Sequence, residues 1–267
     1  MTPSVSVIMA AHRHDPYIDK AAASILAQSF EDFELIIVAN AAPDAFVGHL
    51  TALQSSDLRI RLVRIPLPGL ANALNHGLSL ARGELVARMD ADDISLPDRL
   101  AFERAAMVDD PRLAVVGCRS DLIDARGDVI GEFPFFGDDR SIRRALPYRN
   151  PLLHPCLMMR KSTLISIGGY RYGHMSEDHE MFIRLARDSS ITFKNIDDRL
   201  FQHRRHAGQI TSVDSLKRHY PEVAGFLVTE FLFTHNPMYL VGTVVLHPWV
   251  RSARMMVRAT AKALRSR

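Results

Sequence analysis

The sequence has few cysteines, and its N-terminal apolar run is short. Cys118 and Cys156 are the only cysteines among 267 residues and form no CxxC pair, so neither a disulfide framework nor a cysteine zinc site is indicated. The apolar run from Val5 to Ala11 has no charged segment before it and is too short for a secretory signal. We therefore expect a reduced, cytoplasmic protein.

Long apolar runs and strong charge of one sign are also lacking. Two apolar segments near the C-terminus, 223–233 and 238–250, are split by Asn236-Pro237, and each is shorter than the roughly 20 residues that a bilayer-spanning helix needs. The net charge is only +3, and no basic stripe carries interleaved aromatic residues, so nucleic-acid binding is not indicated.

What the sequence does contain is an alternation of strand-like and helix-like patterns. Apolar, β-branched runs predict strands at 5–9, 34–38, 60–65 and 85–89. Apolar residues at helical spacing predict one helix that begins at Asp15-Pro16, as N-cap and first helical residue, and a second helix closed by Gly83. This order indicates a doubly wound α/β fold with a mostly parallel sheet, in which ligands bind beyond the carboxyl ends of the strands.

An acidic bend follows the fourth expected strand. Asp90 and Asp92 are two residues apart, so in an extended bend both side chains face the same way. Carboxylate ligands of this kind suit Mg²⁺ or Mn²⁺, which keep positions open for phosphate oxygens. The alternative is an Asx turn in which Asp93 or Ser95 caps a helix that begins near Pro97. Because the bend ends a buried strand, we interpret it as a ligand site.

The segment GLANALNHGLSLARGELVARMDADDISLPDRL, residues 69–100, resembles the core signature of glycosyltransferase family 2. Upstream, residues 5–38 resemble the family's first strand, helix and second strand. Downstream, the blocks at 150–170, 176–186 and 203–211 follow in the family's order. The resemblance implies an inverting enzyme of the GT-A fold that uses a nucleotide-sugar donor.

The resemblance also implies roles on the donor side. Asp92 matches the direct metal ligand, and Asp90 matches a residue that holds the ribose, a metal-bound water or the metal itself. His206 would complete the coordination, although a packed or exposed histidine is the alternative. Arg204 or Arg205 would contact the diphosphate, since arginine forms bidentate phosphate contacts. The expected cofactor is Mn²⁺ or Mg²⁺, which neutralises charge on a leaving diphosphate.

On the acceptor side, Asp178 in the segment SEDHE occupies the family's base position, and Glu177 would orient the base or the acceptor. The same segment reads as a helix start, with Ser176 as N-cap and two acids that are favourable at a helix N-terminus. That location lowers the pKa of a carboxylate, so we expect Asp178 to be ionised before the acceptor arrives.

The turn after the second strand departs from the family. Where the family has an Asp-Asp-Gly-Ser type turn that meets the nucleobase, this chain reads VANAAPD, and Asn40 is the nearby side chain able to donate and accept. The base, uracil or another, stays open. Ala10 and His12 stand in the turn before the first helix, which lacks the family's usual Pro and Asn. His12 is a candidate to stack on the base, with an ordinary loop histidine as the alternative.

The organisation expected is a GT-A domain at 1–215 and a helical, basic extension at 216–267. In the extension, basic residues recur at a spacing of three and four, which puts them along one helical face. They are Arg251, Arg254, Arg258, Lys262 and Arg265. Two interpretations stay open: a helical cover with a solvated basic face, or peripheral attachment to the inner face of an anionic cell membrane.

Together these patterns predict a metal-dependent, inverting glycosyltransferase. It would move a sugar to a hydroxyl of a glycan or lipid-linked glycan in polysaccharide or lipopolysaccharide biosynthesis of the cell envelope. One alternative is a nucleotide-sugar-binding relative without transfer activity, suggested by the missing turn carboxylates. Another is a nucleotidyltransferase, which would need a glycine-rich phosphate loop after the first strand, where this chain reads MAAHRHD.

Overall fold

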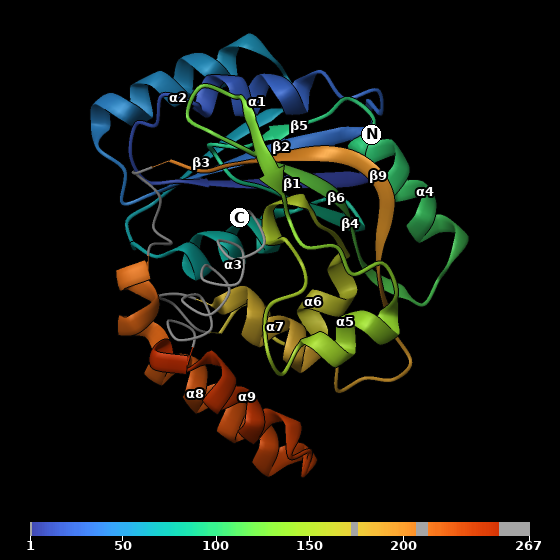
Figure 1. Ribbon diagram of the computed structural model, residues 1–267. Coiled ribbons are helices and arrows are strands. Elements are labelled where there is room, and N and C mark those ends of the chain that lie inside the picture. The colour runs from blue at the N-terminus through green and yellow to red at the C-terminus, as the bar shows by residue number, and fades with distance from the viewer. Residues whose placement is uncertain (1, 172–175, 207–212, 251–267) are drawn as a thin grey trace, which may run out of the picture.

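A nine-stranded sheet with helices on both faces forms the body of the protein (Figure 1). The computed structural model describes residues 2–171, 176–206 and 213–250. Neighbouring strands follow the order β3-β2-β1-β4-β8-β6-β9-β5, with β7 paired to the side of β6. Figure 1 shows α1 and α2 above the sheet and α3, α5, α6 and α7 below it.

The N-terminal half of the sheet is parallel, as predicted. Its elements are β1 (Val5–Ala11), α1 (Ile18–Leu26), β2 (Phe33–Asn40), α2 (Asp44–Ser56), β3 (Ile60–Ile65), α3 (Leu70–Leu80) and β4 (Leu85–Met89). β1 pairs with both β2 and β4, and β2 pairs with β3, all in parallel. The chain steps outward from β1 to β3 and then returns to the other side of β1. The resulting switch point between β1 and β4 is where ligands bind in such sheets.

The start of α1 differs from the prediction. The helix begins at Ile18, with Tyr17 at the cap position, rather than at Pro16. Asp15 accepts a hydrogen bond from the backbone N–H of Tyr17 at 2.9 Å, so its carboxylate forms a turn before the helix instead of capping it. The apolar stripe itself is confirmed, because Ile18, Ala21, Ala22 and Ile25 are all buried against the sheet.

The second half of the sheet is mixed. Its elements are β5 (Ile94–Ser95), α4 (Arg99–Asp109), β6 (Leu113–Ile123), β7 (Val129–Glu132), α5 (Asp139–Ala145), the 3₁₀ turn η1 (His154–Cys156), β8 (Met158–Arg160), α6 (Lys161–Ser166), α7 (Glu177–Leu185) and β9 (Thr192–Arg204). β8 runs antiparallel between β4 and β6, whereas β6 and β9 form a long parallel pair. The strand β9 therefore carries its carboxyl end toward the acidic bend, where β5 pairs with it.

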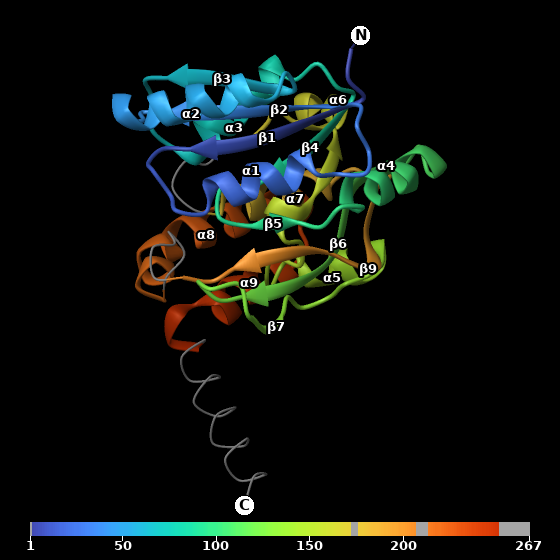
Figure 2. The ribbon, with the colours of Figure 1, turned by 90° about the horizontal axis from the view of Figure 1, so that it is seen from above.

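The chain then forms a helical hairpin, drawn orange to red in Figures 1 and 2, from α8 (Val213–Thr234) and α9 (Met238–Leu246). It packs against α7 and the segment after α5. Arg187 pairs with Glu230 at 2.5 Å, and a Cβ at Gly242 would collide with the Pro147 carbonyl. The predicted domain boundary after residue 215 falls inside α8 and stays a prediction, and the basic residues of 251–267 lie outside the described residues. Among the described residues, no helix combines the length and apolar character needed to cross a bilayer.

Candidate active site

The acidic bend lies directly beside the switch point of the sheet. Each of Asp90, Asp92 and Asp93 offers one carboxylate oxygen, and these atoms lie within 4.8 Å of one another. Asp90 and Asp92 are half-buried, whereas Asp93 is fully buried. The carboxylates that face outward are therefore Asp90 and Asp92, the pair that the spacing of two predicted.

Asp93 ties the bend to the end of β9. Its Oδ1 accepts the backbone N–H of Arg204 at 2.7 Å, and both of its oxygens lie 3.1 Å from Nδ1 of His203. Burial raises the pKa of Asp93 to about 6, while the hydrogen bond from His203 opposes that rise. Asp93 does not cap the following helix, since α4 begins at Arg99 with Asp98 at the cap position.

The same end of β9 brings His206 to Asp92. Nε2 of His206 lies 3.0 Å from Oδ2 of Asp92. Arg204 supports this contact by donating from Nε to the Asp92 carbonyl at 2.7 Å and from Nη1 to the Asp124 carbonyl at 2.9 Å. Its guanidinium carbon lies 4.3 Å from the centre of the Tyr17 ring. In this arrangement Arg204 holds the backbone of the bend, whereas the side chain of the next residue, Arg205, is exposed.

The donor set fits a divalent cation. Neighbouring ligands of a six-coordinate ion at about 2.1 Å lie about 3 Å apart, which matches the 3.0 Å between Asp92 Oδ2 and His206 Nε2. Carboxylate oxygens with one imidazole nitrogen suit Mn²⁺ well and Mg²⁺ less well, because Mg²⁺ prefers oxygen alone.

Arg88 is a site residue that sequence reasoning missed. Its guanidinium is almost fully buried and pairs with Asp90 at 2.5 Å while also donating to the Met89 carbonyl. Arg88 lies within the predicted apolar strand 85–89, and its side chain points to the carboxyl edge of the sheet. A buried charge that is paired holds its partner in one orientation, so Arg88 fixes the direction of Asp90.

The N-terminus of α7 carries the predicted base. One oxygen of Asp178 accepts from Nδ2 of Asn150 at 2.7 Å and the other from the backbone N–H of His179 at 2.7 Å. Ser176 stands at the N-cap position of α7, as predicted, with φ +70°. Its side chain makes no capping hydrogen bond, so the side-chain cap that the prediction implied is wrong.

The expected direction of the Asp178 pKa is also wrong. Burial raises the pKa of Asp178 to about 6, and the charge of Asp90 adds to the rise, although the His179 N–H and Asn150 oppose it. Burial and the charge of Asp178 likewise raise the pKa of Glu177 to about 8, with Arg88 acting in the opposite direction. The charge of Asp90 contributes to both pKa shifts, so the bend lies near the start of α7.

The turn after α6 lies beside α7. Gly168 and Gly169 have φ of +76° and +65°, so they end α6 and form the turn as predicted. Asn75 of α3 grips the next residue through two hydrogen bonds, to the backbone N–H of Tyr170 at 2.9 Å and to its carbonyl at 2.8 Å. The Tyr170 hydroxyl then lies 2.9 Å from Nε2 of His154. Asn75 thereby joins α3 to the turn that follows α6.

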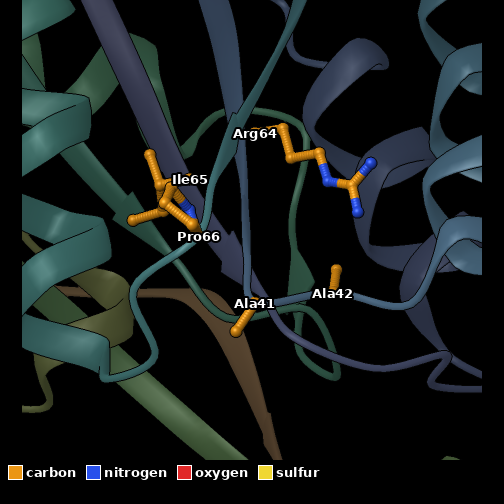
Figure 3. Close-up of a pocket in the computed structure, with 5 residues that line it drawn as sticks. All are labelled: Ala41, Ala42, Arg64, Ile65 and Pro66. Carbon is orange, nitrogen blue, oxygen red and sulfur yellow. The ribbon is translucent and has the colours of Figure 1, made fainter.

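The carboxyl ends of β2 and β3 form a hollow of about 500 Å³, shown in Figure 3 with its lining residues Ala41, Ala42, Arg64, Ile65 and Pro66. Asn40 is buried next to it, and its Nδ2 donates to the Gly69 carbonyl at 3.5 Å, which leaves Oδ1 as the acceptor. Ala10 pairs with Val38 at the end of β1, and His12 is exposed in the loop that follows.

Comparison with known proteins identifies the family. The model of glycosyl transferase family 2 matches residues 6–167. The chain belongs to this family. It is 35% identical to the O-antigen biosynthesis glycosyltransferase WbnJ of Escherichia coli, over 85% of this chain and 89% of that protein. It is 34% identical to the amylovoran biosynthesis glycosyltransferase AmsE of Erwinia amylovora over 46% of this chain and 47% of that protein.

Solved structures agree on the fold of this family 2 chain. S. aureus TarS 1–349 in complex with UDP-GlcNAc has a TM-score of 0.67 at 18% identity, covering 86% of this chain and 66% of that one. The mannosyltransferase PcManGT of Pyrobaculum calidifontis, in complex with GDP-Man and Mn²⁺, has a TM-score of 0.64 at 18% identity, covering 99% and 81%. The predicted GT-A fold, with a helical part at the C-terminal end, is confirmed.

Proposed function

We propose that this family 2 glycosyltransferase transfers one sugar, with inversion, from a nucleotide-diphosphate donor to a hydroxyl of a cell-surface glycan or its lipid-linked precursor. Two observations support the proposal: the pairing of Asp92 with His206, and the charge of Asp90, which helps to raise the pKa of Asp178. A relative from Escherichia coli, 27% identical, is a galactosyltransferase that acts on a GlcNAc-diphosphoundecaprenol. Such an acceptor class fits an envelope role.

On the donor side, Asp92 and His206 would hold a Mn²⁺ or Mg²⁺ ion, with Asp90 beside them. When bound, the ion supplies positive charge that neutralises the departing diphosphate. Arg88 keeps the Asp90 carboxylate turned toward the bend through their 2.5 Å contact. Arg205 lies exposed just after β9, and its guanidinium would bind a phosphate oxygen of the donor.

On the acceptor side, Asp178 is the base. The acceptor oxygen forms the new bond to the anomeric carbon, the bond from that carbon to the diphosphate oxygen breaks, and the hydroxyl proton moves to Asp178. A pKa raised by burial to about 6 leaves this carboxylate ionised at neutral pH yet basic enough to accept the proton. Glu177, with its pKa raised to about 8, is protonated at pH 7 and can donate a hydrogen bond that orients the acceptor.

For the donor base, Asn40 is the recognition residue. Because its Nδ2 donates to the Gly69 carbonyl, its Oδ1 accepts the ring N–H that both uracil and guanine carry. Ala10 lies beside Val38 of β2 near the end of β1, and His12, exposed in the loop that follows, would provide a stacking surface. Donors of both kinds, UDP-GlcNAc and GDP-Man, are bound by the structural neighbours.

The protein would work in the cytoplasm at the inner face of the membrane, where lipid-linked acceptors are. The basic residues of 251–267 support this location, because lysine and arginine are attracted to anionic headgroups. Removal of 252–267 should then weaken binding to anionic vesicles.

Release of nucleotide from a panel of UDP-, GDP-, dTDP- and CMP-sugars, with Mn²⁺ and with chelator, tests the proposed activity. A transferase hydrolyses its own donor slowly in the absence of acceptor, and only with metal. If a nucleotide sugar stabilises the protein against thermal unfolding but no donor releases nucleotide, the protein would instead be the nucleotide-sugar-binding relative without transfer activity. Stabilisation by nucleoside triphosphates alone would favour a nucleotidyltransferase.

A further inference from the structure

The segment before the basic tail is a bilayer-length stretch without charge. Residues 231–250 contain no Asp, Glu, Lys or Arg. Twenty such residues in one helix would approach the length of a membrane span. Asn236-Pro237 interrupts them, and His235 turns the chain with φ +54°, so the stretch folds into the end of α8 and the antiparallel helix α9. An uncharged segment folded back in this way can lie along a bilayer but cannot cross it.

The hairpin presents large apolar side chains to solvent. One side of each helix is buried on the domain, through Phe226 and Leu227 of α8 and Tyr239 and Gly242 of α9. We call the large apolar side chains that stay exposed on α8, on α9 and just after α9 the hairpin face. It consists of Val228, Leu232, Phe233, Met238, Leu240, Val241, Val244 and Trp249. Phe233 is 69% exposed and Trp249 is 82% exposed. Exposure of so many large apolar side chains on one hairpin marks an interaction site.

The hairpin is fixed to the helix that carries the base. The ring of Phe226 packs edge-on against His179, with ring centres 5.4 Å apart, and Nε2 of His179 lies 2.7 Å from the Leu146 carbonyl. Arg187, just after α7, pairs with Glu230 of α8. Whatever holds the hairpin face therefore also holds α7, through His179 and Arg187.

We propose that the hairpin face inserts into the headgroup layer of an anionic bilayer and orients the active site toward it. Charge complementarity selects this occupant: the 17 residues that follow Val250 contain six arginines or lysines and no acidic residue. An apolar helical face beside a basic segment, with tryptophan at the boundary, is the pattern of interfacial membrane binding. The inference goes beyond electrostatic attachment of the tail, because it adds a hydrophobic contact that salt does not screen.

Trp249 allows a direct test, since it is the only tryptophan of the chain. The full-length protein is mixed with vesicles of phosphatidylcholine containing phosphatidylglycerol, without donor or acceptor. Insertion predicts that Trp249 emission moves to shorter wavelength, that brominated acyl chains quench it, and that this signal persists in 0.5 M NaCl, a concentration at which roughly a 4 Å screening length remains. Adsorption of the tail alone predicts no quenching and release by salt.

The double substitution V241E/V244E keeps the tryptophan and places carboxylates on exposed positions of the hairpin face. It should weaken vesicle binding by roughly tenfold or more, with an unchanged melting temperature. L58E, on a fully exposed leucine at the end of α2, is the matched control and should bind like the wild type. Equal quenching in V241E/V244E would overturn the proposal. A stable dimer in solution, with Trp249 shielded from acrylamide before lipid is added, would overturn it in favour of a second copy on the hairpin face.

The test is separate from the proposed transfer reaction, because neither donor nor acceptor is present. Loss of vesicle insertion with intact donor hydrolysis would refute the hairpin face alone. Intact insertion without donor hydrolysis would refute the transferase alone.

Discussion

Nε2 of His206 lies 3.0 Å from Oδ2 of Asp92, although 114 positions separate the two residues. Two further contacts hold the same chain segments together, between His203 and Asp93 and between Arg204 and the Asp92 carbonyl. Successive residues at the end of β9 thus contact the acidic bend. The pairing of His206 with Asp92 is the one that the proposed cation site requires, since both atoms would be its ligands.

Removal of either partner should abolish this cation site. D92N and H206A are each expected to lower metal-dependent donor turnover by about 100-fold, because each removes a group that would neutralise the leaving diphosphate through the ion. Steady-state turnover across a Mn²⁺ titration measures the effect. D109N, on an exposed carboxylate at the end of α4, is the control and should titrate like the wild type.

Loss of the base should affect chemistry and leave donor binding intact. D178N keeps the size and the hydrogen-bonding shape of the side chain but cannot take a proton, so kcat should fall by about 10²- to 10⁴-fold. The donor Kd should stay within about twofold of the wild-type value. Equal losses in donor affinity and in kcat would show that Asp178 serves donor binding instead.

The acid limb of the pH profile should follow the Asp178 environment. Asn150 donates to the ionised carboxylate and lowers its pKa, against the rise to about 6 caused by burial. N150L removes that donor, so the pKa rises further and the acid limb of kcat/KM moves to higher pH. A limb that stays in place while kcat falls uniformly would mean that Asn150 acts on the fold alone.

The stability of the protein should depend on pH through Glu177. Its pKa is raised to about 8 by burial, above the value of 4.5 for an unperturbed glutamate. Between these values the folded state binds more protons than the unfolded state, so stability falls as pH rises from about 4.5 to 8. E177Q should reduce this slope, most clearly between pH 6 and 8, and should be more stable than the wild type at pH 8 by about a few kcal/mol. Parallel melting curves from pH 5 to 9 would contradict the assignment.

The turn that Asn75 holds after α6 should not tolerate a side chain at Gly169, its second glycine. Gly169 has φ +65°, and a Cβ there would collide with Oδ1 of Asn75. G169A should therefore cost about 1–3 kcal/mol of stability and loosen the Tyr170 wall of the site. Gly48 lies within α2 with open space around it, so G48A should instead stabilise by about 0.5–1 kcal/mol. Denaturant unfolding of both variants measures the contrast.

The parallel half of the fold was predictable because its signals are local. Apolar periodicity gave strands and helices within a few residues of their observed bounds, and Asp90 fell at a strand end. The antiparallel strand β8 was not predictable, because its three residues carry no periodicity and its partners β4 and β6 are distant in sequence.

The carboxylates of the candidate site could be predicted from the sequence, but the directions of their pKa shifts could not. A helix start suggested a lowered Asp178 pKa, yet burial dominates and raises it, and burial depends on packing that residues near Asp178 do not reveal. The role of Arg88 could not be predicted, because one charged residue within an apolar strand pattern does not indicate that it pairs with a residue two positions later. The hydrogen bonds between Asn75 and Tyr170 join residues 95 positions apart, and no sequence pattern predicts them.

Thermal stabilisation by nucleoside diphosphates, with and without Mn²⁺, tests the central claim most directly. The account predicts that UDP or GDP raises the melting temperature of the wild type only when Mn²⁺ is present, and that D92N abolishes the shift while D178N retains it. Stabilisation of D92N equal to that of the wild type, or no shift with any nucleoside diphosphate and Mn²⁺, would contradict it.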